Sequence, residues 1–147
     1  MDIFRAMFGE LSEIQKAVMD RAVSETYAKR GITEDHYHDK APPILSDLYT
    51  ELEKLSKAAS VYERTTYVAL LNRLRMYVDG VFSFVNRQTK INIDNEFITF
   101  NIGAMPKQVK PVMMFLILDY VYSQMKASRG RKLLVIDEAW SMLQNAA

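Results

Sequence analysis

The chain has 147 residues, of which 49% are hydrophobic and 25% are charged, and its formal net charge is +1. This composition supplies enough apolar side chains for a core, excludes a disordered chain, and gives no global field for nucleic acid. The absence of cysteine excludes a disulfide framework and a cysteine-based zinc site, and it suits the cytoplasm. Asp2 and Arg5 interrupt the start, so no secretory signal is predicted, and the longest apolar run, Val112 to Leu118, is too short to span a bilayer.

The first part of the chain predicts one helix followed by a loop. Ser12 with Gln15 three residues later is a capping-box pattern, and Gly31 is suited to the C′ position after the helix ends. The polar segment Thr33 to Ala41 precedes two prolines and is expected to be a loop. The apolar arc of the helix is made by Ile14, Val18, Met19, Ala22, Val23 and Tyr27.

Two further helices are predicted before Gly80. Ser46 is the candidate N-cap of the first, and the second is expected to run from about Tyr62 to Val78. Three amphipathic helices with short connections predict a small helical bundle over residues 1–80. The apolar stripes are Leu48, Leu52 and Leu55 in the first of these helices, and Tyr67, Leu70, Leu71, Leu74 and Val78 in the second.

The pattern changes after Gly80. Short extended pieces are expected around Phe82, Phe84, Ile91 and Ile93. The segment from Phe97 to Ile102 alternates and is rich in β-branched and aromatic residues, which favours a strand.

A helix is predicted next, with Pro111 in its first turn and its end near Ser128. It is apolar on nearly all sides and is therefore expected to be buried. The uninterrupted apolar run from Leu133 to Ile136 is typical of a central parallel strand. Strand, helix and strand form a right-handed crossover, so residues 81–147 are predicted to be one βαβ unit. The predicted fold class is α/β and mostly helical.

Two carboxylates, Asp137 and Glu138, directly follow this apolar run. In open α/β sheets, ligands bind at the carboxyl ends of the strands. An aspartate at this place in P-loop NTPases holds the Mg²⁺ that bridges the β- and γ-phosphates, and a carboxylate directly after it can orient or deprotonate the attacking water. The pattern predicts Asp137 as metal ligand and Glu138 as catalytic residue. The alternative is an acidic pair that closes a strand and opens a helix, but the preceding strand and helix favour the chemical interpretation.

The block from Val135 to Leu143 resembles the Walker B segment of the VirB-type (TraC-type) ATPases of type IV secretion and conjugation, which are relatives of the HerA and FtsK motors. The segment Pro43 to Leu48 and the leucine helix after it resemble the all-α insertion of this family. Gly80 to Asn86 and Phe97 to Ile102 resemble the lead-in to its second core strand. The resemblance implies an all-α bundle inserted in a partial RecA-like P-loop NTPase core.

Two parts of the family pattern are missing. Walker A, G-x-x-x-x-G-K-[ST], supplies backbone N–H groups, a lysine and a hydroxyl to the phosphates, and no glycines in this chain have its spacing. The family's glutamine sensor and arginine finger have no counterpart after Trp140. The resemblance therefore implies a fragment from after Walker A to just past Walker B, which is not expected to hydrolyse ATP by itself. The glycines are Gly9, Gly31, Gly80, Gly103 and Gly130.

For the intact protein, the resemblance implies ATP and Mg²⁺ as cofactors and self-association as a hexamer. It also implies other secretion components as partners, and a cytoplasmic or peripheral position at the inner face of the cell membrane. One alternative is a HerA- or FtsK-like DNA translocase, which salt-dependent DNA binding would identify. Another is a non-catalytic module that binds a partner through the helical bundle.

Weaker features have simpler interpretations. His36 and His38 suit an extended metal chelate, but they are the only histidines and a solvated loop is favoured. Trp140 is expected to pack the corner between strand and helix, and the methionines of the last helix to fill a core. Basic residues in the second and third helices could track phosphates, but nearby glutamates favour a solvated face: Lys54, Lys57, Arg64, Arg73 and Arg75. Arg129 and Arg131 are expected to serve the turn before the apolar run.

Overall fold

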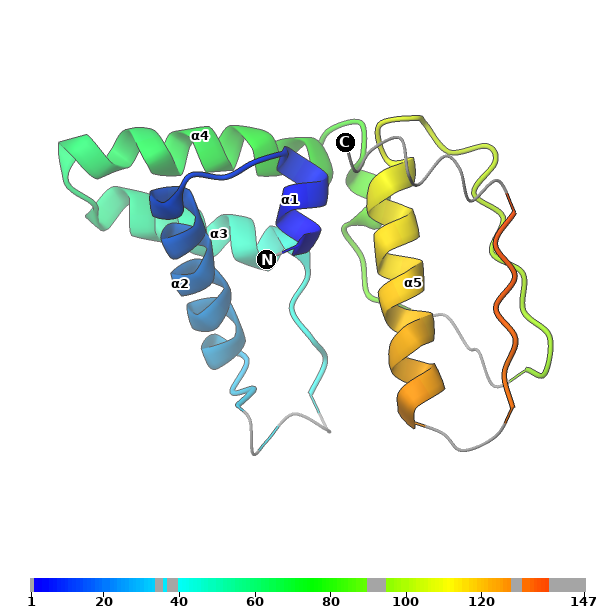
Figure 1. Ribbon diagram of the computed structural model, residues 1–147. Coiled ribbons are helices and arrows are strands. Elements are labelled where there is room, and N and C mark those ends of the chain that lie inside the picture. The colour runs from blue at the N-terminus through cyan, green and yellow to red at the C-terminus, as the bar shows by residue number, and fades with distance from the viewer. Residues whose placement is uncertain (1, 34–35, 37–39, 90–94, 128–130, 138–147) are drawn as a thin grey trace. The chain divides into compact units, whose positions relative to one another are not determined.

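The computed structural model describes residues 2–33, 36, 40–89, 95–127 and 131–137. Its elements in chain order are α1 (Asp2–Phe8), α2 (Glu13–Lys29), α3 (Leu45–Ala58), α4 (Val61–Val78), the short 3₁₀ helix η1 (Ser83–Val85) and α5 (Lys110–Ala127) (Figure 1). The chain divides into two compact units, one of Glu10–Ile93 and one of Asp2–Gly9 with Asp94–Ala147. We call them the helical unit and the C-terminal unit.

The caps of α2 form as the sequence predicts. Ser12 Oγ accepts from the backbone N–H of Gln15 at 3.3 Å, and Gln15 Oε1 accepts from the backbone N–H of Ser12 at 3.0 Å. Beyond the helix, Gly31 has a φ of 64°. Glycine is favoured in this left-handed conformation because it has no Cβ to clash with the backbone. The predicted capping box and C′ glycine are confirmed.

The start of α3 differs from the prediction. The N-cap is Ile44 instead of Ser46, because the Asp47 carboxylate accepts the backbone N–H of Ile44 at 2.8 Å. Asp47 also accepts from Arg30 Nη2 at 2.8 Å, which joins this cap to the end of α2. Ser46 lies inside the first turn, where its backbone N–H donates to Asn86 Oδ1 at 3.0 Å. A carboxylate three residues after Ile44 thus places the N-cap two residues before the serine.

A second capping box begins α4. Ser60 Oγ accepts from the backbone N–H of Glu63 at 3.4 Å, and the Glu63 carboxylate accepts from both the backbone N–H and the hydroxyl of Ser60. These hydrogen bonds to its charged form lower the pKa of Glu63. The charged Glu63 carboxylate therefore stabilises the fold at a pH above the pKa that Glu63 has in the unfolded chain. This stabilisation is lost as the pH falls through the lower pKa that Glu63 has in the folded chain.

Replacement of Ser60 by alanine is expected to lower the free energy of unfolding of the helical unit by about 1 kcal/mol, because it removes the N-cap acceptor. Ser24→Ala is the matched control. Ser24 is exposed inside α2, where alanine is the better helix former, so its replacement should be neutral or slightly stabilising. Urea denaturation followed by circular dichroism measures both changes. Equal losses in the two variants would contradict a capping role for Ser60.

The core of the helical unit lies between its three long helices. Helix α3 packs along α4, and α2 packs on both (Figure 1). Ile14, predicted on the core face of α2, is exposed, because Met19, Ala22 and Thr26 make the buried face instead. The leucine stripe of α3 and most of the stripe of α4 are buried as predicted: Leu48, Leu52, Leu55, Tyr67, Leu70 and Leu74.

The segment after α4 folds back on that helix. Extended backbone was predicted around Phe82 and Phe84, but the structure has a turn and η1 there. The ring of Phe82 lies 5.3 Å from that of Tyr77 between centroids, and the Phe82 backbone N–H donates to the carbonyl of Met76 at 3.0 Å. The prediction is wrong because burial of the Phe82 ring against α4 requires a tight turn after Gly80.

In the C-terminal unit, α1 packs against α5. Helix α5 begins at Lys110 with Pro111 in its first turn, close to the predicted bounds. The prediction that this helix is buried is wrong: along it only Val112 is buried among the residues described, while Phe115, Leu116 and Tyr122 are exposed. Within the described residues no strand covers these side chains. No described helix is long and apolar enough to cross a membrane.

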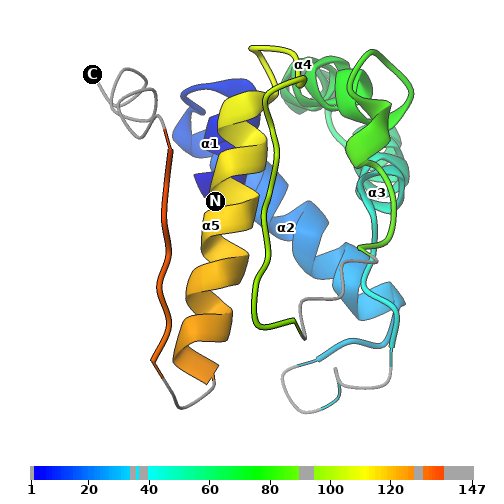
Figure 2. The same cartoon turned by 90° about the vertical axis from the view of Figure 1, so that its right-hand side faces the viewer.

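Both predicted strands are elongated stretches of chain without regular secondary structure, and Phe97 lies in a bend (Figure 1). Neither Phe97 to Ile102 nor Leu133 to Ile136 has a strand partner in the described part of the chain. The two segments run lengthwise along α5, and Figure 2 shows them apart. A strand requires a neighbour that supplies ladder hydrogen bonds, so these segments keep an extended backbone without a sheet. Ile91 and Ile93, also predicted as extended, lie outside the described residues.

Candidate functional site

Asp137 lies at the exposed end of the extended segment 131–137. It directly follows Ile136, as the sequence pattern requires, and its carboxylate is accessible to a ligand. Glu138 and Trp140 lie outside the described residues, so the structure places one member of the predicted catalytic pair. The position of Asp137 is compatible with a metal ligand, and the role of the pair stays a prediction.

The beginning of this segment is held to the end of α5. Lys132 Nζ donates to the backbone carbonyl of Gln124 at 3.1 Å and lies 3.5 Å from that of Met125. These carbonyls belong to the last turn of the helix, where the backbone acceptors have no partner inside the helix and the dipole is negative. Lys132 therefore caps α5 and sets where the segment that carries Asp137 begins.

The described residues around Asp137 do not form a metal site by themselves. No group of three or more His, Asp or Glu side chains that could hold a metal occurs in the part of the chain that the structure describes. A single carboxylate binds Mg²⁺ together with water and substrate phosphates in nucleotide sites. Asp137 would thus need phosphate oxygens held by another part of a protein. His36 is exposed, and His38 is not among the described residues.

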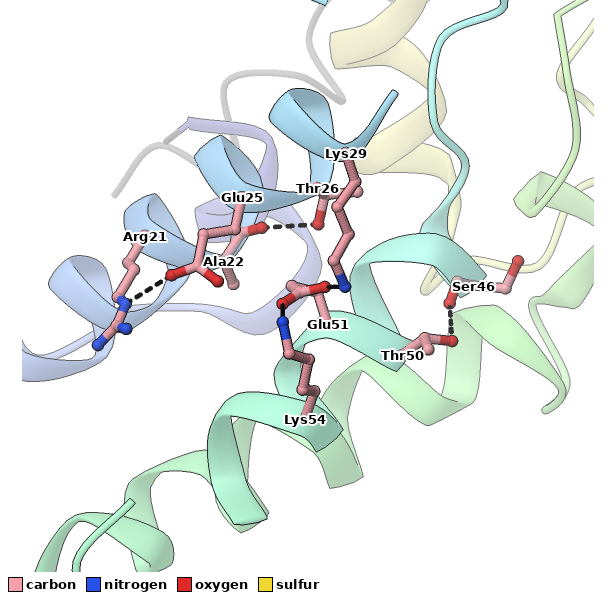
Figure 3. A network of polar contacts seen from close by, with 9 residues as sticks. All are labelled: Arg21, Ala22, Glu25, Thr26, Lys29, Ser46, Thr50, Glu51 and Lys54. Carbon is pink, nitrogen blue, oxygen red and sulfur yellow. Dashed lines mark hydrogen bonds and ion pairs between the residues drawn. The ribbon is translucent and has the colours of Figure 1, made fainter. Parts of the chain in front are cut away.

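The structure reveals one polar cluster that the sequence analysis missed (Figure 3). The Glu51 side chain is only 1% exposed in the middle of α3. Lys29 of α2 donates to its Oε2, and Lys54 Nζ lies 3.4 Å from its Oε1. The sequence contains a signal for this burial. Glu51 is three residues after Leu48, so it lies on the same face of the helix as the leucine stripe.

The cluster around Glu51 joins two helices and has the character of a structural contact. The lysines that flank Glu51 are about half exposed, so one end of each remains in water. Nearby, Thr26 Oγ1 donates to the carbonyl of Ala22 at 2.6 Å, and Arg21 Nε donates to Glu25 at 2.8 Å (Figure 3). These contacts stabilise α2 and its packing on α3.

Lys29→Met is expected to lower the free energy of unfolding by about 1–3 kcal/mol, because a buried carboxylate loses its closer cation. Glu51→Met should cost less, since it removes the buried charge and leaves two lysines that reach water. Urea denaturation of both variants and of the double variant measures the difference. A larger loss for Glu51→Met than for Lys29→Met would show that the ion pair itself, and not the buried charge, controls stability.

The basic residues of α3 and α4 have separate surroundings. Lys57 and Arg64 are exposed, and Arg75 Nε lies 3.6 Å from Asp79. Arg73 Nη1 is buried and has no hydrogen-bond partner among the described residues. Since one of these cations is partly buried and another is paired, the arrangement does not resemble a surface that follows a phosphate backbone.

Comparison with known proteins supplies the family context of this arrangement. No protein-family model and no curated protein matches the sequence. Among solved structures, the chain is similar to VirB4 of Thermoanaerobacter pseudethanolicus, with a TM-score of 0.83 and 26% sequence identity over 95% of this chain. The match covers 39% of the VirB4 chain, so this chain spans less than half the length of that protein. The resemblance to VirB-type proteins that the sequence indicated is therefore confirmed by the solved structure of a VirB4.

Proposed function

We propose that this chain supplies the Mg²⁺- and water-binding half of the ATPase site of a type IV secretion or conjugation motor. The observation that carries the proposal is the place of Asp137, at the exposed end of an apolar extended segment in a fold similar to VirB4. Glu138 follows it directly in the sequence. An acidic pair after an apolar strand is the Walker B arrangement of P-loop NTPases.

In this proposal the two carboxylates have different tasks. Asp137 holds Mg²⁺ through water, and the ion neutralises the charge on the β- and γ-phosphates of ATP. Glu138 orients the attacking water and accepts its proton. The phosphates require a Walker A loop, which this sequence does not contain. The chain by itself is therefore proposed to lack ATPase activity.

The same proposal assigns a place to each unit. The helical unit corresponds to the all-α domain of the family, inserted in a RecA-like core to which the C-terminal unit contributes. In the assembled motor, which we propose to be a hexamer, the helical unit faces neighbouring subunits or other secretion components. Hydrolysis then drives transport of the substrate or assembly of the machine, in the cytoplasm at the inner face of the cell membrane.

A chimaera tests this proposal. The region of T. pseudethanolicus VirB4 that matches this chain, 39% of its length, is replaced by residues 1–147. The chimaera is expected to hydrolyse ATP in the presence of Mg²⁺, and this chain alone is expected to show no turnover above the buffer rate. Unaltered VirB4 is the positive control, and VirB4 without the region is the negative control. A folded chimaera that binds a fluorescent ATP analogue without hydrolysing ATP would refute the proposal.

A further inference from the structure

Helix α4 exposes apolar side chains on the side that does not pack on α3 (Figure 1). Tyr62 and Val61 are 92% and 78% exposed, and Met76 and Val68 are 46% and 45% exposed. Thr65 is exposed among them, and its Oγ1 donates to the carbonyl of Tyr62 at 3.1 Å, so this hydroxyl is satisfied within the helix. We use the name outer face of α4 for the exposed residues Val61, Tyr62, Thr65, Val68, Asn72 and Met76.

Their spacing makes these residues one surface. Intervals of four, three, four and four residues separate Val61, Thr65, Val68, Asn72 and Met76. Such intervals keep side chains on one side of a helix. The opposite side of α4 carries the buried core residues Tyr67, Leu70, Leu74 and Tyr77. Helix α4 is therefore apolar on two sides, and the core of the helical unit uses only one of them.

Arginines lie along both edges of the outer face. Arg64 and Arg75 are exposed and eleven residues apart, close to three full turns, so they lie along the same edge. Arg73 lies along the other edge and is partly buried. The ion pair of Arg75 with Asp79, at 3.6 Å, is exposed and therefore weak. From Arg64 to Val78 the helix has three arginines and no carboxylate, so its outer face carries a positive charge.

We propose that the outer face of α4 binds an amphipathic helix of another protein, whose apolar seam is flanked by carboxylates. A helix laid along α4 would remove the exposed apolar side chains from water, and the arginines would select an acidic partner. Arg64 and Arg75 are about 16 Å apart along the helix axis, so the partner presents carboxylates over a similar length. The inference goes beyond the proposed ATPase function and does not rest on it, because Asp137 and Glu138 lie outside α4.

The charges disfavour a second copy of this chain as the partner. If two outer faces paired in opposite directions, Arg64 of one copy would lie near Arg75 of the other. If they paired in the same direction, Arg75 of one copy would lie on the side of Arg73 of the other. Both arrangements bring like charges together, which is unfavourable. A phosphate backbone is also a poor occupant, because it would leave the apolar side chains in water.

Helical peptides of opposite charge test the proposal on the full 147-residue chain. The first has three repeats of Glu-Ile-Ala-Ala-Leu-Glu-Lys, about 21 residues, which places glutamates on both sides of an apolar seam. The second has the glutamates and lysines exchanged. Fluorescence anisotropy should show binding of the glutamate peptide, and binding of the lysine peptide at least about tenfold weaker. Equal affinities, or no binding of the glutamate peptide up to about 1 mM, would overturn the proposal.

Variants of the chain locate the binding surface. Arg64→Glu and Arg75→Glu should each raise the Kd of the glutamate peptide about fivefold, because each replaces an attraction by a repulsion. Val68→Ala should raise it about threefold, because it removes apolar area from the middle of the outer face. Lys57→Glu changes the net charge equally at an exposed position of α3 and should leave this Kd unchanged. Far-ultraviolet circular dichroism should show the same helix content in all four variants.

Three further results would each overturn the proposal. A loss of affinity in Lys57→Glu as large as in Arg64→Glu would show that binding follows the net charge of the chain. A dimer in sedimentation velocity that Val68→Ala dissociates would show that a second copy covers the outer face. Binding of the peptide by the chain alone, but not by the VirB4 chimaera, would show that another part of the longer protein covers it.

Discussion

Glu138→Gln in the VirB4 chimaera is expected to lower kcat for ATP hydrolysis by about 10²–10⁴-fold, the usual contribution of a positioned general base. Glutamine has nearly the shape of glutamate but cannot accept the proton of the attacking water. Substrate binding does not use this proton transfer, so KM should change little. Steady-state phosphate release at several ATP concentrations separates the two constants.

Two further variants of the chimaera are compared with Glu138→Gln. Asp137→Ala should weaken the dependence of turnover on Mg²⁺, so that higher concentrations of the ion are needed. Glu96→Gln replaces another exposed carboxylate of the C-terminal unit and should leave kcat unchanged. Turnover that survives in Glu138→Gln would show that another residue activates the water and would withdraw this role from Glu138.

Leu70→Ala is expected to lower the free energy of unfolding of the helical unit by about 2–5 kcal/mol. Leu70 is 0% exposed on α4, on the helix that packs along α3. The loss has two parts: the transfer of the missing side-chain atoms and the cavity that they leave in a close-packed interior. Chemical denaturation of the full chain, followed by circular dichroism of the helices, measures the effect.

Val68→Ala on the same helix is the matched control for Leu70→Ala. Val68 is exposed, and alanine has the higher helix propensity, so the change in stability should be within about 0.5 kcal/mol. A loss at Val68 as large as that at Leu70 would mean that α4 is buried on its outer face as well. The helical unit would then have to be a part of a larger packed body.

Local signals in the sequence determined much of the helical unit and the identity of the candidate site. The capping box of Ser12 and Gln15 and the leucines of α3 act over three or four residues, so a single helical turn contains their cause. Asp137 was identified in the same way, from the apolar run directly before it. The similarity to VirB4 was likewise indicated by a short block of residues.

Only the tertiary structure decided the features that depend on residues far apart in the chain. Glu51 is buried because Lys29, 22 positions earlier, meets it from α2, and Arg30 donates to Asp47, 17 positions later, at the start of α3. The apolar run before Asp137 has the composition of a strand, but in the described chain it remains an extended segment. Local propensity can extend the backbone, whereas a sheet also needs a neighbour whose N–H and C=O groups complete the ladder.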